Sequence, residues 1–435
     1  IATVSSKKIE ERYTPNILNN LEGRVAGLTT YGGKTTIRGT SSLYAETNPL
    51  LVVDGLPIEG KIEDLNPYDI ESINVLKDAA ATAIYGARAS NGIIVITTKN
   101  AKKEGKIDID FSANFTTWEK KNVDYTDNFY MNAAQQVKVE SAYYDYYYLN
   151  NDGEIADPIG STETTLVTGR ASLSPIQMAY YNLAKGNISK ADVDALLAKL
   201  SRNNYAKEYA DAIYKRQFLQ QYNLALRSRS NKFQSNLTLN YKHDNSGIIN
   251  AENSLLNISY KGVYDIAKWL TASFTINGIY GKVKEAGYDY NSAHRNIWGR
   301  AAYDTMYNED GTYKMFYPGT SGYEEWWENP ENAEGLYHMG TIYRDEFYNN
   351  TVETKRQHMR YHGDLQFKII KGLTANAQFI YEDDRQSQDW HANEKSSVAR
   401  QIRNAYTIKD SNGVVSYMTP RTGGMLRSTT THGAS

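Results

Sequence analysis

Alternation of apolar and polar residues after Lys106 is the feature that most constrains the fold. Apolar side chains occupy every second position in several segments, a period of two that is typical of β-strands of roughly ten residues. The segments are KIDIDFSANF, YNLALRSR, FQSNLTLNYK, LNISYKGVY, LTASFTINGIY, MRYHGDLQFKI and LTANAQFIYE. Their apolar faces carry no charge, whereas their opposite faces are polar and charged. The pattern predicts a sheet with an oily face toward lipid and a wet face inward, as in a transmembrane β-barrel.

Short and long connections alternate between these segments. SNK, DIAK and KGL are tight turns, whereas residues 119–217, 282–355 and 386–435 are expected to form long extracellular loops. Periplasmic turns are short and extracellular loops are long in bacterial barrels. We therefore assign residues 106–435 to a barrel wall. Within the loops, a capping box at Ser189 and a proline at Pro175 predict two helices.

Tyrosine is the compositional anomaly, with 36 Tyr against 10 Phe and 6 Trp. Aromatic residues form belts at both membrane interfaces, where an amphipathic ring suits a wet apolar boundary. The strand ends carry such residues, which we expect to form two girdles: Trp118, Tyr241, Tyr280 and Tyr381 above, and Tyr264 and Trp269 below.

Residues 1–105 have a different pattern and are expected to form a small α/β domain. Leu50–Val53, Asp69–Leu76 and Asn91–Lys99 read as strands. Asp54-Gly55 suits a turn in which two residues have positive φ. Asp78 can cap a short alanine-rich helix that ends at Gly86.

Four ordered blocks in this domain carry a family resemblance. LEGRVAGL, TIRGTSS, LLVVDGLPI and DIESINVLKDAAATAIYGARASNGIIVITTK, between Asn16 and Lys99, closely resemble the plug domain of SusC/RagA-type TonB-dependent outer-membrane transporters. TTYGGKTT is shorter than the usual segment between the first two blocks, so residues are expected to be absent near Thr30–Tyr31. The resemblance implies a gating and structural role for the plug motif, which comprises Asp54, Gly55, Lys77, Asp78, Tyr85, Gly86, Arg88, Asn91 and Gly92.

The resemblance also implies a fold and a function. The fold would be a transmembrane antiparallel β-barrel of 22 strands, incomplete here, with the α/β plug in its lumen. The function would be TonB-dependent import of oligosaccharides across the outer membrane of a Gram-negative bacterium. Its partners would be a SusD-like lipoprotein lid, TonB with its inner-membrane motor proteins, and the lipid bilayer. Import of oligopeptides, a surface binding or adhesion protein anchored by its barrel, and a soluble all-β protein remain alternatives.

Several function classes lose support from composition and motifs. The 48 basic and 50 acidic residues nearly balance, which disfavours a nucleic-acid partner, and the absence of cysteine excludes disulfides and thiolate sites. YGARASNG matches no nucleotide-binding loop, and no nucleophile motif indicates an enzyme. No cofactor is expected. His358 and His362 lack a third ligand for a metal, while Glu382–Asp389 and Tyr288–Asn291 offer oxygens to Ca²⁺ but read more simply as acidic loops.

Dense aromatic clusters in the loops are the candidate substrate-binding residues. YYDYYY and EEWWEN combine rings that can stack on sugar faces with carboxylates and amides that can bind hydroxyls. The residues so assigned are Tyr143, Tyr144, Tyr146, Trp326 and Trp327. The alternative is that these rings pack the loops together or against another protein, since Tyr and Trp also dominate interface hot spots.

Overall fold

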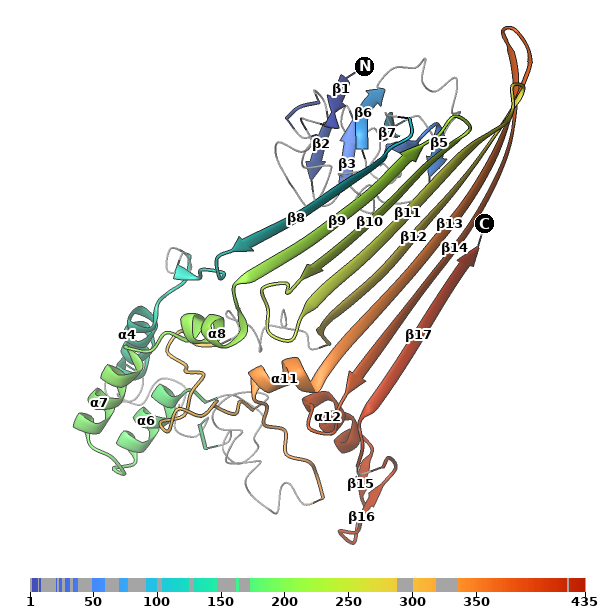
Figure 1. The fold of residues 1–435 in the computed structure, drawn as a ribbon. Helices are drawn as coiled ribbons and strands as arrows, with labels where there is room; N and C mark the ends of the chain where they lie inside the picture. The colour runs from blue at the N-terminus through green and yellow to red at the C-terminus, as the bar shows by residue number, and fades with distance from the viewer. Residues whose placement is uncertain are drawn as a thin grey trace.

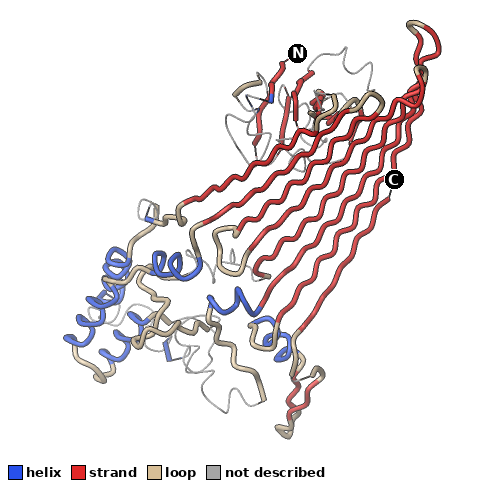
Figure 2. Tube along the Cα trace, viewed as in Figure 1, coloured by secondary structure: helices blue, strands red, loops and turns tan. Residues whose placement is uncertain are grey.

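The computed structural model separates the chain into a small α/β domain and a large curved sheet (Figures 1 and 2). The structure describes residues 2–6, 8, 21, 23–25, 28–31, 34–37, 49–58, 70–76, 91–99, 104–124, 129–146, 162–163, 173–287, 300–317, 335–420 and 422–434.

The small domain is built on a five-stranded sheet in the order β1-β6-β7-β4-β5. The bounds are β1 Ala2–Ser5, β4 Leu50–Val53, β5 Leu56–Ile58, β6 Ile70–Leu76 and β7 Ile93–Thr98, with a separate pair, β2 Leu28–Tyr31 and β3 Lys34–Ile37. Strands β4 and β7 pair in parallel, and the remaining neighbours pair antiparallel. Their β-branched side chains are buried on both faces, for example Val52 and Ile94, which explains the continuous apolar runs in the sequence.

The large sheet has eight strands in sequential antiparallel order, β8 to β14 followed by β17. We call it the wall sheet. The bounds are β8 Ile107–Trp118, β9 Gln217–Arg229, β10 Phe233–Asp244, β11 Glu252–Ala267, β12 Leu270–Ala286, β13 Asn350–Ile370, β14 Leu373–Ala392 and β17 Met425–Ala434.

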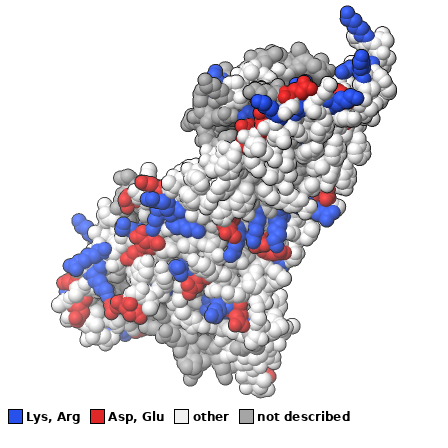
Figure 3. Space-filling model, viewed as in Figure 1, with Lys and Arg blue, Asp and Glu red and all other residues white. Residues whose placement is uncertain are grey.

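Polarity across the wall sheet is inverted relative to a soluble protein. The apolar face is exposed, for example Ile107 at 69%, Phe111 at 67% and Phe379 at 67%, whereas Asn223 and Asn240 on the other face are each 3% exposed. Figure 3 shows an uncharged belt across the strands between two charged zones. Because exposed apolar surface of this extent is unfavourable in water, the outer face is suited to lipid.

All six predicted girdle aromatics are exposed, but only Tyr241, Tyr264, Tyr280 and Tyr381 lie at outward positions of strands; Trp269 lies in the turn before β12, and Trp118 has the register of the inward-facing positions of β8. Their exposed fractions run from 39% for Trp118 to 57% for Trp269. Beyond Tyr280 the outward positions of β12 become Lys282 and Lys284, and beyond Tyr381 β14 continues with Asp383. The apolar belt therefore ends at these tyrosines, while the strands continue.

Strand length and strand number differ from the sequence-based expectation. The strands run from 10 residues in β17 to 21 in β13, rather than roughly ten throughout. Parts of the expected loops 282–355 and 386–435 are therefore strand, including all of β17. The alternation of apolar residues stops where a strand leaves the belt, because neither face is then required to be oily, so periodicity could not locate these extensions.

The connections sort by length onto the two ends of the wall sheet. The short turns at 230–232, 268–269 and 371–372 lie at the end near the small domain, and the long connections carry helices at the other end (Figures 1 and 2). The helices are α4 Ala133–Tyr144, α6 Pro175–Ala184, α7 Lys190–Leu200, α8 Tyr205–Ile213, α11 Tyr343–Asn349 and α12 Ser397–Ala405, with the hairpin β15 Thr407–Lys409 and β16 Val415–Tyr417.

Two of these helices begin as the sequence predicts. Ser189 and Asp192 form the reciprocal capping box of α7, and Pro175 is the first residue of α6. Gly186 follows α6 with a φ of 75°, a left-handed conformation that favours glycine. Within the described ranges, none of the helices is long and apolar enough to cross a membrane.

Candidate functional site: the interface between plug and wall

Two hydrogen bonds between described residues join the small domain to the inward face of the wall sheet. The Lys261 ammonium of β11 donates to Asp54 Oδ2 at 2.7 Å, and Asn236 Nδ2 of β10 donates to the Lys99 carbonyl at 3.0 Å. Asn236 and Lys261 are direct cross-strand partners, so both contacts fall on one row of the wall. The small domain is therefore held on the polar side of the sheet.

The turn at Asp54-Gly55 positions the carboxylate for this contact. Asp54 has a φ of 49° and Gly55 a φ of 90°, as expected for a two-residue hairpin turn between β4 and β5. Asp54 also accepts hydrogen bonds from the Thr98 backbone N–H at 2.9 Å and the Thr98 hydroxyl at 2.7 Å. Strand β7, the hairpin and the wall thus converge on one carboxylate.

The charge state of Asp54 follows from these neighbours. Burial alone would raise the pKa of the carboxyl, but the Lys261 charge and the hydrogen bonds from Lys261 and Thr98 together hold the pKa below its usual value. Asp54 and Lys261 are each 22% exposed, so the ion pair is only partly screened by solvent. We call these two residues the latch pair.

Gly92 of the plug motif is required by packing. Its φ is 89°, and a Cβ at this position would lie 2.8 Å from Ile37 Cδ1. Strand β7 therefore begins against β3 in a way that only glycine allows. Asn91 lies beside it in the described chain, whereas Lys77, Asp78, Tyr85, Gly86 and Arg88, with the predicted helix, lie outside the described residues.

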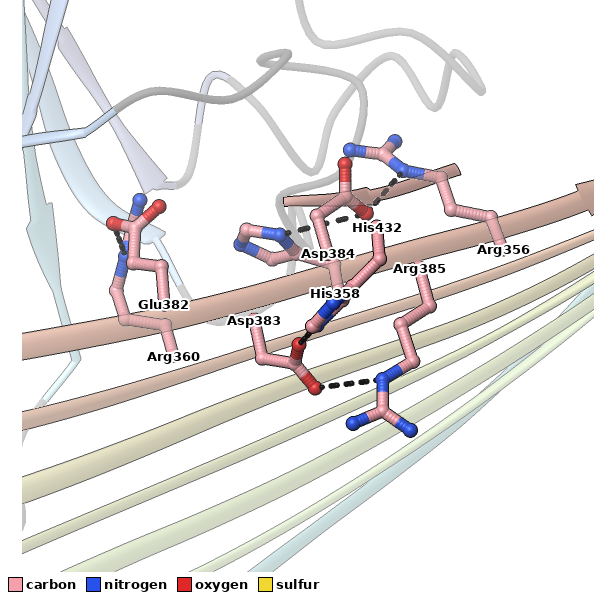
Figure 4. Close-up of polar contacts among 8 residues, drawn as sticks. All are labelled: Arg356, His358, Arg360, Glu382, Asp383, Asp384, Arg385 and His432. Atoms are coloured by element: carbon pink, nitrogen blue, oxygen red, sulfur yellow. Dashed lines mark hydrogen bonds and ion pairs between the residues drawn. The ribbon is translucent and has the colours of Figure 1, made fainter. Parts of the chain in front are cut away.

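The inward face of β13 and β14 carries a cluster of charged side chains (Figure 4). Arg360 pairs with Glu382 at 2.5 Å, while Arg356 and His358 lie 3.5 Å and 3.8 Å from Asp384. His362 is four residues from His358 on the same strand and does not share its acidic neighbour. Among the described residues, no three His, Asp or Glu side chains come close enough to hold a metal ion.

The acidic segment Glu382–Asp389 is strand β14 rather than the loop that the sequence suggested. Its side chains alternate between the two faces. Glu382 and Asp384 point inward, whereas Asp383 faces outward, where it lies 2.5 Å from His432 and 3.2 Å from Arg385 (Figure 4). Alternation separates the carboxylates, so they do not form one calcium site. Tyr288–Asn291 lies outside the described residues.

The aromatic substrate-binding candidates are placed in part. Tyr143 and Tyr144 end helix α4, with rings 5.1 Å apart, and Tyr144 packs 5.9 Å from Tyr180 of α6. Tyr143 and Tyr146 remain exposed at 53% and 55%. Tyr144 thus packs helices together, whereas more than half of the surface of Tyr143 and of Tyr146 is exposed. Trp326 and Trp327 lie outside the described residues.

Sequence reasoning missed the wall's half of the interface. The alternation placed Lys261, Asn236 and Asn240 on the inward polar face of their strands. It cannot say which of these residues contacts the plug. The available signal was Lys261, a lysine within a strand long enough to cross the membrane. An unpaired charge at such a position is unfavourable in free energy and therefore needs a partner.

Comparison with known proteins agrees with this geometry. Residues 1–93 match the TonB-dependent Receptor Plug Domain family. The TonB-dependent receptor SusC of Bacteroides thetaiotaomicron is 41% identical over 118 residues, which cover 23% of this chain and 12% of SusC. The TonB-dependent receptor P39 of Formosa agariphila is 41% identical over 109 residues, 23% of this chain and 10% of P39.

Similarity to solved structures extends through the wall sheet. A structure of the RagAB peptide importer in its closed-closed state superposes with a TM-score of 0.64 at 21% sequence identity, covering 90% of this chain and 41% of that chain. The chain therefore spans less than half the length of these relatives. At this identity the superposition shows the fold.

Residues 1–93 match the plug domain of TonB-dependent receptors, and the fold combines an α/β plug with part of a β-barrel. The resemblance to SusC/RagA-type transporters that the sequence indicated is confirmed. TonB-dependent receptors are outer-membrane proteins of Gram-negative bacteria, and the relatives named above are described as receptors and as a peptide importer.

Proposed function

We propose that the whole protein imports an oligomeric nutrient across the outer membrane in a TonB-dependent reaction. The observation that carries the proposal is the latch pair. It joins the small domain to the polar face of the wall sheet, whose apolar face is exposed. A protein that only anchors a surface structure needs no domain inside its barrel. In this proposal residues 1–105 are the plug and residues 106–435 the N-terminal part of the wall.

A SusD-like surface lipoprotein is the proposed partner at the loop end. Helices α4, α6 and α7 pack around Tyr180 and Val193 into a structured platform there, and Phe129, Tyr130 and Tyr143 are exposed on it. Aromatic rings exposed on a rigid support are typical of protein interfaces. TonB with its motor proteins would act from the opposite end, where the plug lies.

Oligosaccharides are the proposed cargo, supported by the exposed rings of Tyr143 and Tyr146. Oligopeptides are the second candidate, since RagAB is described as a peptide importer. No cofactor is proposed.

Uptake in cells tests the proposal. The full-length gene is deleted and restored in its own host, with and without TonB, and depletion of oligosaccharide and peptide pools is followed by mass spectrometry. Import predicts that depletion requires both the receptor and TonB. A surface adhesin predicts binding that persists without TonB, and that result would reject the transport function.

A further inference from the structure

Lys242 is a lysine on the inward face of the wall sheet that lacks a counter-ion among the described residues. It lies on β10, is only partly exposed, and stands directly opposite Gln221 of β9. The ammonium forms no ion pair with a described residue, and the described charge that acts on it is that of Asp244. A partly buried charge without a partner is unfavourable in free energy, and native proteins retain such groups where water, an ion or a ligand supplies the partner.

Asp244, two residues farther along β10, is engaged by other donors. Its carboxylate accepts from the Gln217 side-chain amide at 2.9 Å and 3.1 Å and from the Ser246 backbone N–H at 2.9 Å. Gln217 begins β9 and Ser246 follows the end of β10, so both donors lie toward the loop end of the sheet. Asp244 is therefore held toward the loops rather than paired with Lys242.

Two amide side chains beside Lys242 have buried polar atoms without a partner. Asn240 and Gln221 are each 3% exposed. Asn240 Nδ2 donates to no atom, and Gln221 Oε1 accepts from none, in the described part of the chain. Alternate residues of one strand share a face, and Cβ atoms directly opposite in antiparallel strands are about 4.5–5.5 Å apart, so the three side chains border one patch. We call Lys242, Asn240 and Gln221 the lysine patch.

The lysine patch lies on the loop side of the latch pair. Asn236, the cross-strand partner of Lys261, is six residues before Lys242 on β10, a separation of about 20 Å at about 3.4 Å per residue. The next described charge on the row of Lys242 is Arg356, three strands away, which already lies 3.5 Å from Asp384. A molecule that enters from the loops therefore meets the Lys242 ammonium before it reaches the plug contacts.

We propose that the lysine patch is a subsite for the carboxylate of an acidic cargo molecule on its way to the plug. This inference rests on the proposed import function. The Lys242 ammonium and Asn240 Nδ2 are both donors, from which a carboxylate can accept, and Gln221 Oε1 can accept from a hydroxyl or N–H beside that carboxylate. A neutral cargo would leave the ammonium without a counter-ion, so the patch favours an acidic molecule over its neutral counterpart.

Uptake of matched acidic and neutral probes tests the subsite. Cells that carry the full-length receptor with its native partners receive oligosaccharides from partial hydrolysis of pectin, alginate and glucuronoxylan, and peptides from a casein digest. Each pool is supplied once with free carboxylates and once with its carboxylates converted to methyl esters. The half-saturating concentration for depletion is measured by mass spectrometry for the wild type, Lys242→Met, Lys242→Arg and Lys282→Met.

Lys282→Met is the matched control. Lys282 lies on the outward face of β12, beyond Tyr280, and so cannot contact a molecule inside the wall. Its partner Glu353 lies 2.9 Å from Lys282 and 2.8 Å from Lys355, and therefore keeps one ammonium in the variant.

We expect the wild type to deplete a free-acid pool at a lower concentration than the corresponding ester. Lys242→Met should raise the half-saturating concentration of that free acid about 10-fold to 100-fold, the effect of one lost charge-assisted hydrogen bond, and leave the ester unchanged. Lys242→Arg should keep the preference for the acid, and Lys282→Met should behave as the wild type. Whether the oligosaccharide or the peptide pool shows the preference identifies the source of the carboxylate.

Stability separates this role from a structural one. The midpoint of thermal unfolding of purified Lys242→Met should equal or exceed the wild-type value, because an unpaired ammonium is replaced by an apolar side chain. A lower midpoint in parallel with weaker uptake would assign Lys242 a structural partner and overturn the inference.

Two further outcomes reject the subsite. Free-acid uptake that Lys242→Met leaves unchanged, or equal uptake of acid and ester by the wild type, would reject it while leaving import intact. A wild type that depletes none of the pools would reject import itself, and the subsite with it.

Discussion

Breaking the latch pair should loosen the plug without unfolding the wall. In the Lys261→Met variant, Asp54 loses the ammonium at 2.7 Å but keeps both hydrogen bonds from Thr98. Removing one partner of a fully buried pair costs about 3–5 kcal/mol, and exposed pairs contribute about 0–1 kcal/mol. At 22% exposure for each side chain, a value of about 1–3 kcal/mol is expected.

Hydrogen exchange measures this loss directly. A loss of about 1–3 kcal/mol raises the population of the detached plug by about 5-fold to 150-fold, and amides of β4 and β7 should exchange faster by that factor. Lys242→Met is the matched control. Lys242 lies on the neighbouring strand β10, on the same inward face of the wall sheet as Lys261, and forms no ion pair with a described residue. Equal exchange in Lys261→Met and wild type would refute the latch, as would faster exchange in Lys242→Met of the same size.

Three further predictions concern pH, the belt and the loops. The pKa of Asp54 is lowered in the folded protein, so its contribution is present above the unfolded pKa of about 3.9 and is lost as the pH falls through the folded pKa. The protection that the latch pair gives to β4 amides should therefore be constant at pH 5–8 and be lost only in stronger acid, and a loss of protection between pH 5 and 8 would contradict this assignment. Phe274→Lys places a charge in the exposed belt and should lower the free energy of unfolding, measured with urea in lipid vesicles, by about 2–4 kcal/mol. Ser273→Lys, which is inward and opposite Asp364, should lower it far less. Equal losses of stability would contradict the assigned faces. Glu346→Ala removes the carboxylate that accepts from the Ser397 N–H at 2.7 Å and from the Ser397 hydroxyl at 3.0 Å. The free energy of opening of α12, measured by hydrogen exchange, should fall by about 2–3 kcal/mol, and unchanged exchange would count against this cap.

Short-range sequence patterns predicted the strands, turns and helix caps that depend on neighbouring residues. The strand Leu50–Val53, the turn at Asp54-Gly55 and the cap at Ser189 all appear where short-range sequence placed them. Alternation also assigned the two faces of the wall correctly, since a one-residue error would have put Phe274 inside and Thr275 outside.

Long-range features were beyond sequence reasoning. The latch pair joins residues 207 positions apart, and no local pattern couples Asp54 to Lys261. The pairing of Asn236 with Lys261 needs the register of β10 and β11, which neither strand reveals on its own. Tyr144 packs against Tyr180, whereas Tyr143 is 53% exposed, and only tertiary structure decides how much of each ring in an aromatic cluster is covered.

Spin labels at adjacent positions of β12 test the central claim most directly. These 435 residues contain no cysteine, so a single cysteine at Phe274 or Thr275 is the one labelling site in this part of the receptor, which is reconstituted into vesicles. The label at position 274 should be accessible to oxygen, which concentrates in lipid, and protected from a water-soluble nickel chelate. The label at position 275 should be poorly accessible to oxygen. Two equally water-accessible positions, or the reverse order, would contradict a sheet that turns its apolar face to lipid around an enclosed plug.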